Sequence, residues 1–271
     1  MSENKPIFSI IVPTRHRPVQ LRDFCLRALA RMDYPRDKYE VIVVHDGDDG
    51  FMQPSEAFLE HLDLRFITQL HAGPAVARNT GADAAKGQFL AFTDDDCAPD
   101  RDWLKSMTRA IAKKTRAAVG GRTVNLLTGN PYSTASQMLI DYLYLHYNRE
   151  PERARFLATN NLVVPQRLFH KVGGLSGAFS LGGEDREFCH RWLSRGYSLV
   201  YAPQAIVRHA HHLRFSSFLR QHFTYGRGAF RYHLAVAGSG KQPLQFEKPA
   251  FYWKLLRYPF LHKQGWRSFY W

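Results

Sequence analysis

The sequence has few cysteines and no long apolar run. Its three cysteines, Cys25, Cys97 and Cys189, form no CxxC pair and cannot all be paired in disulfides. A disulfide framework and a zinc ribbon are therefore not expected, and the pattern is typical of a reducing compartment. No stretch of 18 apolar residues is present, so no transmembrane helix is predicted. The apolar run near the N-terminus is too short for a signal peptide and fits a first strand, so we expect a cytoplasmic protein.

Several common nucleotide and hydrolase motifs are also missing. The sequence contains no GxxxxGK[ST] phosphate loop, no GxGxxG after a strand and no GxSxG elbow. These absences argue against the usual nucleoside triphosphatases, dinucleotide-binding enzymes and serine hydrolases.

Acidic residues are scarce near the C-terminus. Residues 186–271 hold 14 Lys and Arg but only two acids, Glu187 and Glu247, a net charge of +12. Residues 1–185 carry only +1 of the total net charge of +13. Positive and negative charges thus nearly cancel in residues 1–185, whereas residues 186–271 are strongly basic. Such a basic segment favours a polyanionic partner, either nucleic acid or an anionic lipid surface.

Short apolar runs alternate with helical patterns along the first part of the chain. The predicted order is strand 7–12, helix 19–32, strand 40–44, strand 64–67, helix 74–86 and strand 88–93. This alternation implies an α/β fold with a mainly parallel sheet flanked by helices. A chain of 271 residues suits one such domain with an extension. We place the domain at residues 1–212 and a basic, aromatic helical extension at residues 213–271.

The second half of the sequence is less regular. Helices are predicted at residues 101–114, 132–147, 165–172, 184–195 and 215–236, and short strands at residues 159–164, 199–201 and 206–209. Helical spacing predicts that Phe188, Trp192 and Leu193 face inward on the fourth of these helices. No internal repeat interrupts this order.

Three consecutive carboxylates, Asp94, Asp95 and Asp96, follow the strand at residues 88–93. Adjacent carboxylates repel one another, so a fold keeps them together where a cation or hydrogen-bond donors neutralise them. Mg²⁺ binds one or two such carboxylates together with substrate phosphates, and a bound metal stabilises a departing diphosphate. A solvated acidic turn before Pro99 is the alternative that the triplet alone leaves open.

Two further candidates lie near the other strand ends. Asp46, followed by Gly47, has the chemistry to accept hydrogen bonds from a base or a ribose, although Asp-Gly is also common in ordinary turns. Arg78 lies on an Ala-rich helical segment, and its planar guanidinium suits anionic oxygens. A solvent-facing arginine on that helix is the simpler alternative.

Two candidates occur later in the chain. Glu184 and Asp185 open a helix after two glycines, where a carboxylate suits either a general base or a simple helix cap. His209, His211 and His212 follow the last predicted strand. We prefer His209 as a metal ligand, with three ordinary polar histidines as the alternative.

Taken together, these patterns resemble the family 2 glycosyltransferases of the GT-A fold. The resemblance runs from Phe8 to His209, roughly three quarters of the chain. It consists of residues 9–15 (SIIVPTR), 43–47 (VVHDG, against a usual VVDDGS), 77–81 (ARNTG), 94–96 (DDD), 159–164 (TNNLVV), 173–174 (GG) and 183–185 (GED). Each motif alone is weak, whereas their common order and spacing are specific.

The resemblance implies an inverting transferase that moves a sugar from a nucleoside-diphosphate sugar to a saccharide or lipid-linked acceptor. Asp185 is implied as the general base, and Glu184 as its assistant or an acceptor contact. The other implied roles are donor-nucleotide binding by Pro13, Thr14, Arg15, Asp46, Arg78, Asp94 and Asp95, Mg²⁺ or Mn²⁺ binding by Asp96, Asp94 and His209, and acceptor binding by Asn160, Asn161 and Trp192.

The sequence departs from the family pattern at two points. His45 replaces the first Asp of the usual pair, which affects the expected contacts to the base. The QxxRW motif of processive synthases is absent after Asp185, although Arg191-Trp192 superficially resembles its end. We therefore expect transfer of one sugar or a few rather than extrusion of a polymer.

The C-terminal aromatic residues allow two interpretations. Nine of them lie among Lys and Arg within residues 251–271, a composition that suits peripheral attachment to an anionic membrane surface. Packing on the domain as a C-terminal helix is the alternative. A nucleic-acid-binding protein would explain this tail but not the acidic strand ends, so no nucleic acid partner is expected. A non-catalytic glycosyltransferase-like scaffold is disfavoured by the set Asp46, Asp94, Asp96 and Asp185.

Overall fold

The computed structural model describes residues 7–47, 50, 53–179, 182–238 and 247–261. Its strands form one sheet in the order β3-β2-β1-β4-β7-β6-β8-β5. The strands are β1 (Phe8–Thr14), β2 (Tyr39–Asp46), β3 (Leu64–Gln69), β4 (Phe89–Thr93), β5 (Cys97–Pro99), β6 (Ala117–Asn125), β7 (Asn161–Pro165) and β8 (Ser198–His209). Only β7 and β5 run antiparallel to their neighbours, which confirms the predicted mixed, mainly parallel sheet.

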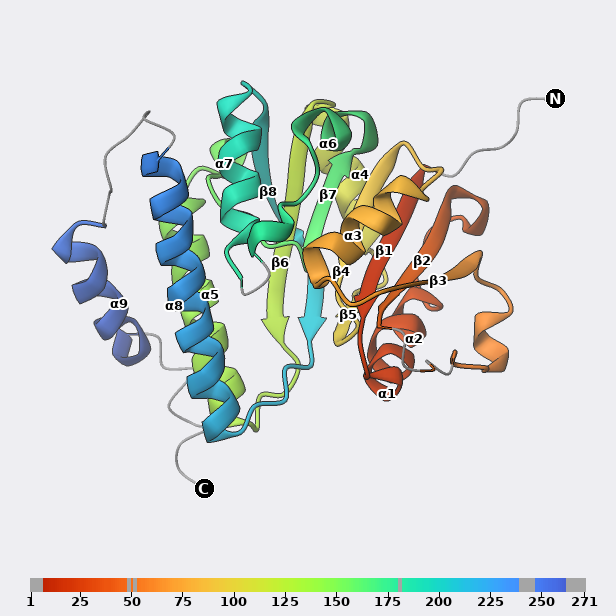
Figure 1. The fold of residues 1–271 in the computed structure, drawn as a ribbon, viewed down its shortest axis with the longest axis horizontal. Helices are drawn as coiled ribbons and strands as arrows, with labels where there is room; N and C mark the ends of the chain where they lie inside the picture. Colours follow the sequence, from red (N-terminus) through yellow and green to blue (C-terminus); the bar gives the residue numbers. More distant parts are fainter. Residues whose placement is uncertain (1–6, 48–49, 51–52, 180–181, 239–246, 262–271) are drawn as a thin grey trace.

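Helices cover both faces of this sheet (Figure 1). They are α1 (Pro18–Gln20), a π-helical segment (Leu21–Leu26), α2 (Arg27–Leu29), α3 (Pro74–Asp83), α4 (Trp103–Lys113), α5 (Pro131–Tyr147), α6 (Gln166–Val172), α7 (Glu184–Ser194), α8 (Phe215–Gly238) and α9 (Pro249–Leu261). Short 3₁₀ turns lie at Arg36–Lys38, Ala57–Leu59, Pro151–Arg153 and Gly177–Phe179.

The central strands are buried on both faces, and their side chains divide between two cores. Ile10 and Val12 point to the core shared with α4 and the segment from α1 to α2, whereas Ile11 points to the core shared with α3, α6 and α7. Side chains alternate between the faces of a strand, so a strand covered on both faces is apolar throughout. The continuous apolar runs of the sequence therefore became the middle of the sheet.

Strand β6 was not predicted, and its composition explains why. Its sequence AAVGGRTVN is rich in small residues and shows no clear alternation. The small residues allow close approach, because a Cβ on Gly121 would lie 2.0 Å from the Ala205 carbonyl oxygen. At this point the pairing with β8 shifts register between Gly121 and Arg122. The two short strands predicted at residues 199–201 and 206–209 are thus one irregular strand.

One side-chain prediction on α7 is wrong. Phe188 and Trp192 are fully buried, as expected, but Leu193 is 38% exposed. Cys189 is buried in its place, because it lies one residue after Phe188 on the side of the helix that packs toward Leu157. The buried stripe of α7 is therefore shifted by part of a turn from the one predicted.

Helix α8 lies beside α5 and touches the loop that precedes α7 (Figure 1). A Cβ on Gly228 would lie 2.3 Å from the Gly182 carbonyl oxygen, and Gly182 and Gly183 have φ angles of +98° and +99°. Gly182 and Gly183 need glycine because other residues are strained at such φ angles, and a Cβ on Gly183 or Gly228 would collide with backbone. This contact holds α8 close to the start of α7.

We expect Gly228→Ala to destabilise the protein by about 1–3 kcal/mol, because the added methyl group collides with backbone that has no room to yield. The matched control is Gly226→Ala on the same helix, where an added Cβ meets nothing within 4 Å. That control should instead stabilise by up to ~1 kcal/mol through helix propensity. Denaturant unfolding measures both, and equal effects would refute the proposed backbone contact.

Helix α9 packs on α5 through aromatic side chains. The Tyr142 hydroxyl donates to the Phe251 carbonyl oxygen at 2.7 Å, and the two rings lie 5.1 Å apart. Tyr258 also contacts the Tyr142 ring at 5.5 Å. Part of the aromatic tail therefore packs on the domain, whereas Trp266, Phe269, Tyr270 and Trp271 lie outside the described residues. Among the described helices, none is both long and apolar enough to cross a membrane.

Candidate functional site

The motif residues gather at one edge of the sheet. Thr14 ends β1, Asp46 ends β2, the acidic triplet follows β4 and His209 ends β8. The carboxyl ends of parallel strands meet at the same edge, which is where open α/β sheets bind ligands. The tertiary structure adds the start of α7, with Glu184 and Asp185, to the same region.

The first loop lies against the acidic triplet. Pro13 is buried within β1, and the Thr14 hydroxyl donates to Asp95 Oδ2 at 2.8 Å. Arg15 is exposed and its Nη1 lies 2.7 Å from His71 Nε2. Arg17, which the sequence analysis did not single out, makes ion pairs with Asp95 and Asp96 at 2.9 and 2.7 Å. The only sequence signal for Arg17 is its position in the loop after Thr14.

The three carboxylates of the triplet have different surroundings. Asp95 is fully buried, and this burial raises its pKa to about 7 despite the Arg17 guanidinium. Burial also raises the pKa of Asp96, but a hydrogen bond and charge from His209, together with Arg17, outweigh burial and hold that pKa well below its usual range. Asp96 is thus ionised at neutral pH and suited to binding a cation.

Asp96, Cys97 and His209 offer atoms suited to a metal ion. One ligand atom from each lies within 4.8 Å of the others, and His209 Nε2 is 3.2 Å from Asp96 Oδ1. Burial raises the pKa of the Cys97 thiol well above its ordinary value, so it stays protonated and is a poor ligand. The Asp96 carboxylate suits Mn²⁺ or Mg²⁺, and the His209 imidazole can bind a metal ion in its neutral form. Asp94, also predicted as a ligand, lies outside this group.

Asp94 instead joins a second cluster around Arg78. Arg78 is only 4% exposed, and its Nη2 donates to Asp94 Oδ1 at 2.6 Å. Its Nη1 lies 3.6 Å from Glu184 Oε1. Within the described residues, the Nε and Nη1 atoms of Arg78 make no hydrogen bond although both are buried. A buried guanidinium with unused donors is suited to binding an anionic group.

Asp185 lies close enough to Arg78 for the arginine charge to affect its ionisation. Its Oδ1 accepts a hydrogen bond from the backbone N–H of Thr159 at 3.2 Å. Burial raises the pKa of Asp185, and the Arg78 charge and the Thr159 hydrogen bond oppose that rise. Burial and the Asp185 charge also raise the pKa of Glu184. Two neighbouring carboxylates with raised pKa values beside a cavity are typical of acid–base sites.

Asp46 has a structural role that its sequence motif did not reveal. Both of its carboxylate oxygens are already used, because they accept hydrogen bonds from Gln69, His71 and the backbone N–H groups of Ala72 and Gly73 at 2.8–2.9 Å. Burial opposes ionisation here, but these bonds together lower the pKa of Asp46. Asp46 thereby fixes the loop that leads into α3.

Two of the predicted acceptor residues do not reach the cavity. Asn161 is fully buried and holds β6 and β8 together through bonds to the Arg122 and Ala205 carbonyl oxygens. Trp192 is fully buried, and its Nε1 donates to the Ser198 carbonyl oxygen. Core packing takes up both side chains, so the structure places neither where it lines the cavity. Asn160 does line the cavity.

The Arg78 cluster and His209 line one cavity of about 530 Å³, whereas Asp96 and Cys97 are not among its lining residues. Its polar wall includes Arg78, Asp94, Asn160, Glu184, Asp185 and His209. Residues of α5, α8 and α9 also line the cavity, which the sequence motifs do not indicate. A cavity of this size that joins several convergent polar groups is suited to a small-molecule substrate.

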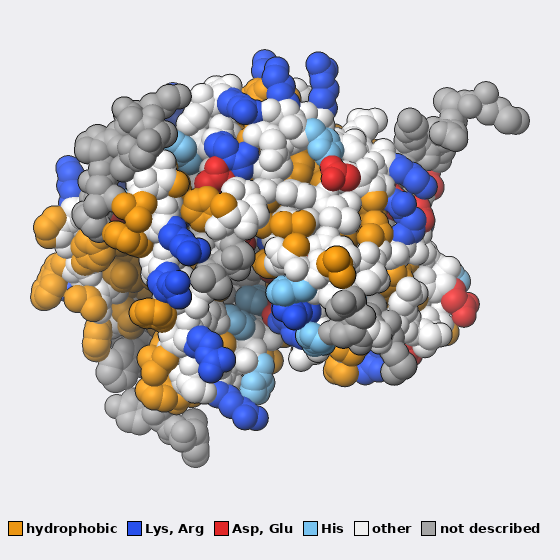
Figure 2. Space-filling model, in the orientation of Figure 1, with side chains coloured by type: hydrophobic (Ala, Val, Ile, Leu, Met, Phe, Trp, Pro, Cys, Tyr) orange, Lys and Arg blue, Asp and Glu red, His pale blue; other side chains and the backbone are white. Residues whose placement is uncertain are grey.

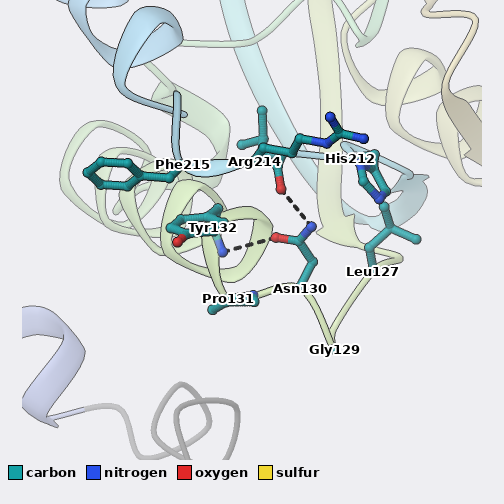
Figure 3. A pocket seen from close by; sticks show the side chains of 9 residues that line it. Leu127, Gly129, Asn130, Pro131, Tyr132, His212, Arg214 and Phe215 are labelled. Atoms are coloured by element: carbon teal, nitrogen blue, oxygen red, sulfur yellow. Dashed lines mark hydrogen bonds between the residues drawn. The ribbon is translucent and has the colours of Figure 1, made fainter. Parts of the chain in front are cut away.

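A second, open pocket of about 590 Å³ lies where α5 and α8 begin (Figure 3). Asn130 Nδ2 donates to the Leu213 carbonyl oxygen, and Asn130 Oδ1 accepts from the Tyr132 N–H. These bonds tie the start of α8 to the start of α5. The pocket contains no carboxylate from the motifs, so the reaction belongs to the other cavity.

Comparison with known proteins identifies the family. The sequence model of glycosyl transferase family 2 matches residues 9–174. Glycosyltransferase AglE of Haloferax volcanii is 29% identical over 232 residues, covering 84% of this chain and 74% of that protein. The pre-mycofactocin glycosyltransferase of Mycobacterium tuberculosis is 29% identical over 228 residues, covering 82% of this chain but only 46% of that protein.

Solved structures show the same fold. A mannosyltransferase from Pyrobaculum calidifontis, solved with GDP-Man and Mn²⁺, superposes with a TM-score of 0.65 at 21% identity, covering 97% of this chain and 74% of that one. Staphylococcus aureus TarS gives a TM-score of 0.56 at 16% identity, covering 75% of this chain and 60% of that one. At these identities the likeness establishes the GT-A fold alone. The match to the family model over most of the chain establishes that this protein is a member of glycosyl transferase family 2.

Proposed function

We propose that this enzyme transfers a sugar from a nucleoside-diphosphate sugar to an acceptor hydroxyl with inversion at the anomeric carbon. The observation that carries the proposal is that Asp94, Asp185 and His209 line one cavity. The cavity therefore joins a base candidate to a diphosphate site. The mannosyltransferase that binds GDP-Man and the TarS structure with UDP-GlcNAc support a nucleotide-sugar donor.

Asp185 acts as the general base. Its carboxylate accepts the proton of the acceptor hydroxyl while that oxygen attacks the anomeric carbon and the bond to the diphosphate breaks. The Thr159 N–H orients Asp185, and the nearby Arg78 charge favours its ionised form. Glu184 lies beside it and contacts the acceptor. A direct displacement of this kind inverts the anomeric centre.

Donor binding uses the residues at the strand ends. Arg78 has unused buried donors for phosphate oxygens, and the exposed Arg15 and half-exposed Arg17 lie at the same edge. Thr14 and Asp95 support the loop, and Asp46 holds the loop before α3 against the nucleotide. Asp96 and His209 would hold Mn²⁺ or Mg²⁺, with Asp94 nearby, and a bound divalent cation would supply positive charge for the diphosphate leaving group.

A donor screen tests this function. Purified protein is incubated with UDP-, GDP- and dTDP-sugars in Mn²⁺, Mg²⁺ or EDTA, and released nucleoside diphosphate is measured. Metal-dependent release from one donor is expected. If no donor shows release or binding while the protein remains folded, the proposed function fails.

We also propose that residues 213–271 form an extension of the domain that attaches to an anionic membrane surface. Figure 2 shows hydrophobic side chains gathered over α9 and Lys and Arg along α8. On α9, Trp253, Leu256 and Phe260 are 62–67% exposed, and Lys254 and Arg257 lie among them. Exposed rings and cations on one helix suit the boundary between lipid headgroups and acyl chains.

We expect the protein to sediment with vesicles containing anionic lipid, and the double substitution Trp253→Ser with Leu256→Ser to reduce the bound fraction at least severalfold. The matched control is Leu70→Ser, which removes a side chain that is 74% exposed but lies on the loop after β3. Equal sedimentation of both variants would contradict the assignment of α9, and no sedimentation of the unchanged protein would contradict membrane attachment.

A further inference from the structure

The cavity that contains Asp185 has a second, apolar wall that donor binding does not explain. Leu139, Ile140 and Leu143 of α5 line it, together with Ala229 of α8 and Phe251 and Leu255 of α9. Nucleoside-diphosphate sugars are polar, and apolar groups contribute little to their recognition. Water is poorly held in apolar surroundings because it lacks hydrogen-bond partners there. This wall therefore suits a hydrocarbon group.

The apolar wall continues to the outer surface of the molecule. Tyr252 lines the cavity and is 46% exposed, and the next turn of α9 presents Leu256, which is 67% exposed. A hydrocarbon chain that begins in the cavity can therefore remain in contact with apolar side chains as it leaves. The polar wall with Glu184 and Asp185 lies in the same cavity. One molecule could thus place a hydroxyl at Asp185 and a chain along α5 and α9.

The end of the cavity near α7 is suited to the polar part of such a molecule. Arg186 lines the cavity and lies over the Tyr147 and Phe156 rings at 5.1 and 5.5 Å. The side chains of Gln137 and His222 also line it. A sugar hydroxyl finds hydrogen-bond donors and acceptors among these side chains.

We propose that the acceptor of this enzyme is amphipathic, with a hydroxyl-bearing polar group at Asp185 and a hydrocarbon chain between α5, α8 and α9. The proposal rests on the proposed function, because it identifies the substrate class of the same site. It assigns α5, α8 and α9 the role of selecting acceptors by their apolar part.

Binding of n-alkyl β-D-glucosides with four, six and eight carbons tests this proposal. Titration calorimetry at concentrations below micelle formation gives each dissociation constant without requiring turnover. Burial of each added methylene group in the cavity should tighten binding about two- to fourfold. A dissociation constant independent of chain length would overturn the proposal.

A matched pair of substitutions tests where the hydrocarbon chain of the acceptor binds. Ala229→Leu fills the apolar wall and should weaken binding of the octyl glucoside at least tenfold, with a smaller effect on the butyl glucoside. Ala235→Leu makes the same change on an exposed position of α8 outside the cavity and should leave both constants unchanged. Equal effects of the two substitutions would overturn the placement.

A second pair guards against effects on folding. Leu143→Asn makes the wall polar, whereas Leu145→Asn changes a residue of α5 that is 55% exposed and outside the cavity. The dissociation constant should become independent of alkyl chain length in Leu143→Asn but not in Leu145→Asn. The donor screen separates the two proposals. Chain-dependent binding of the glucosides by a folded protein that neither binds nor cleaves any donor refutes the proposed function, whereas donor release without chain-dependent binding refutes the amphipathic acceptor.

Discussion

Asp185→Asn should reduce sugar transfer by about 10²–10⁴-fold, the usual contribution of a positioned general base. Asparagine keeps an oxygen that can accept the Thr159 N–H bond, so the local geometry should persist. Donor binding should change little, because Arg78, Asp96 and His209 are untouched. Transfer kinetics and donor titration measured on the same preparation check both expectations.

The stability of this variant provides an independent readout. Burial raises the pKa of Asp185 above its ordinary 3.8, so the unfolded state ionises before the folded state and stability is lost as pH rises above 3.8. Asparagine does not ionise, so Asp185→Asn should become more stable than the unchanged protein as pH increases toward the raised pKa. Thermal unfolding at several pH values measures this difference.

Asp102→Asn is the matched control, since its side chain is 69% exposed and pairs only weakly with Lys105 at 3.7 Å. It should leave both transfer and the pH dependence of stability unchanged. Full transfer by Asp185→Asn would show that another group takes the proton. A variant that is unstable at every pH would contradict the electrostatic argument.

Asp96→Asn should weaken Mn²⁺ binding by at least about 100-fold. Loss of a residue that only supports a metal ligand already costs about 10–100-fold in affinity, and Asp96 is proposed as a direct ligand. Asp96 is the carboxylate of the triplet whose pKa lies well below its usual range, and it lies beside His209. Calorimetry with Mn²⁺ measures the affinity directly. Nucleoside diphosphate release should decrease in parallel and should be abolished by EDTA in the unchanged protein.

The same Asp102→Asn control should retain Mn²⁺ binding. Cys97→Ser tests whether the thiol takes part in metal binding. A thiol that stays protonated contributes little to binding a hard cation. The variant should therefore keep most of the affinity for Mn²⁺. Unchanged Mn²⁺ affinity in Asp96→Asn would remove Asp96 from the proposed metal site.

Much of the fold could be predicted because the relevant signals are local. The apolar runs that became β1, β2 and β4 are buried on both faces, and their length and composition show this without a structure. Strand β6 was not predicted, because its small residues show no strand pattern by themselves and are required only by the close approach of β8. The burial of Cys189 in place of Leu193 likewise depends on which elements pack against α7.

The sequence alone determined the class of the fold, the family resemblance and the placement of Thr14 and the acidic triplet at strand ends, because periodicity and motif order are properties of neighbouring residues. Only the tertiary structure could show that Arg17 pairs with Asp95 and Asp96, and that Arg78 joins Asp94 to Glu184. It also decided that Asn161 and Trp192 belong to the core and that α5, α8 and α9 line the cavity. These relations join residues far apart in the chain, and packing in three dimensions establishes them.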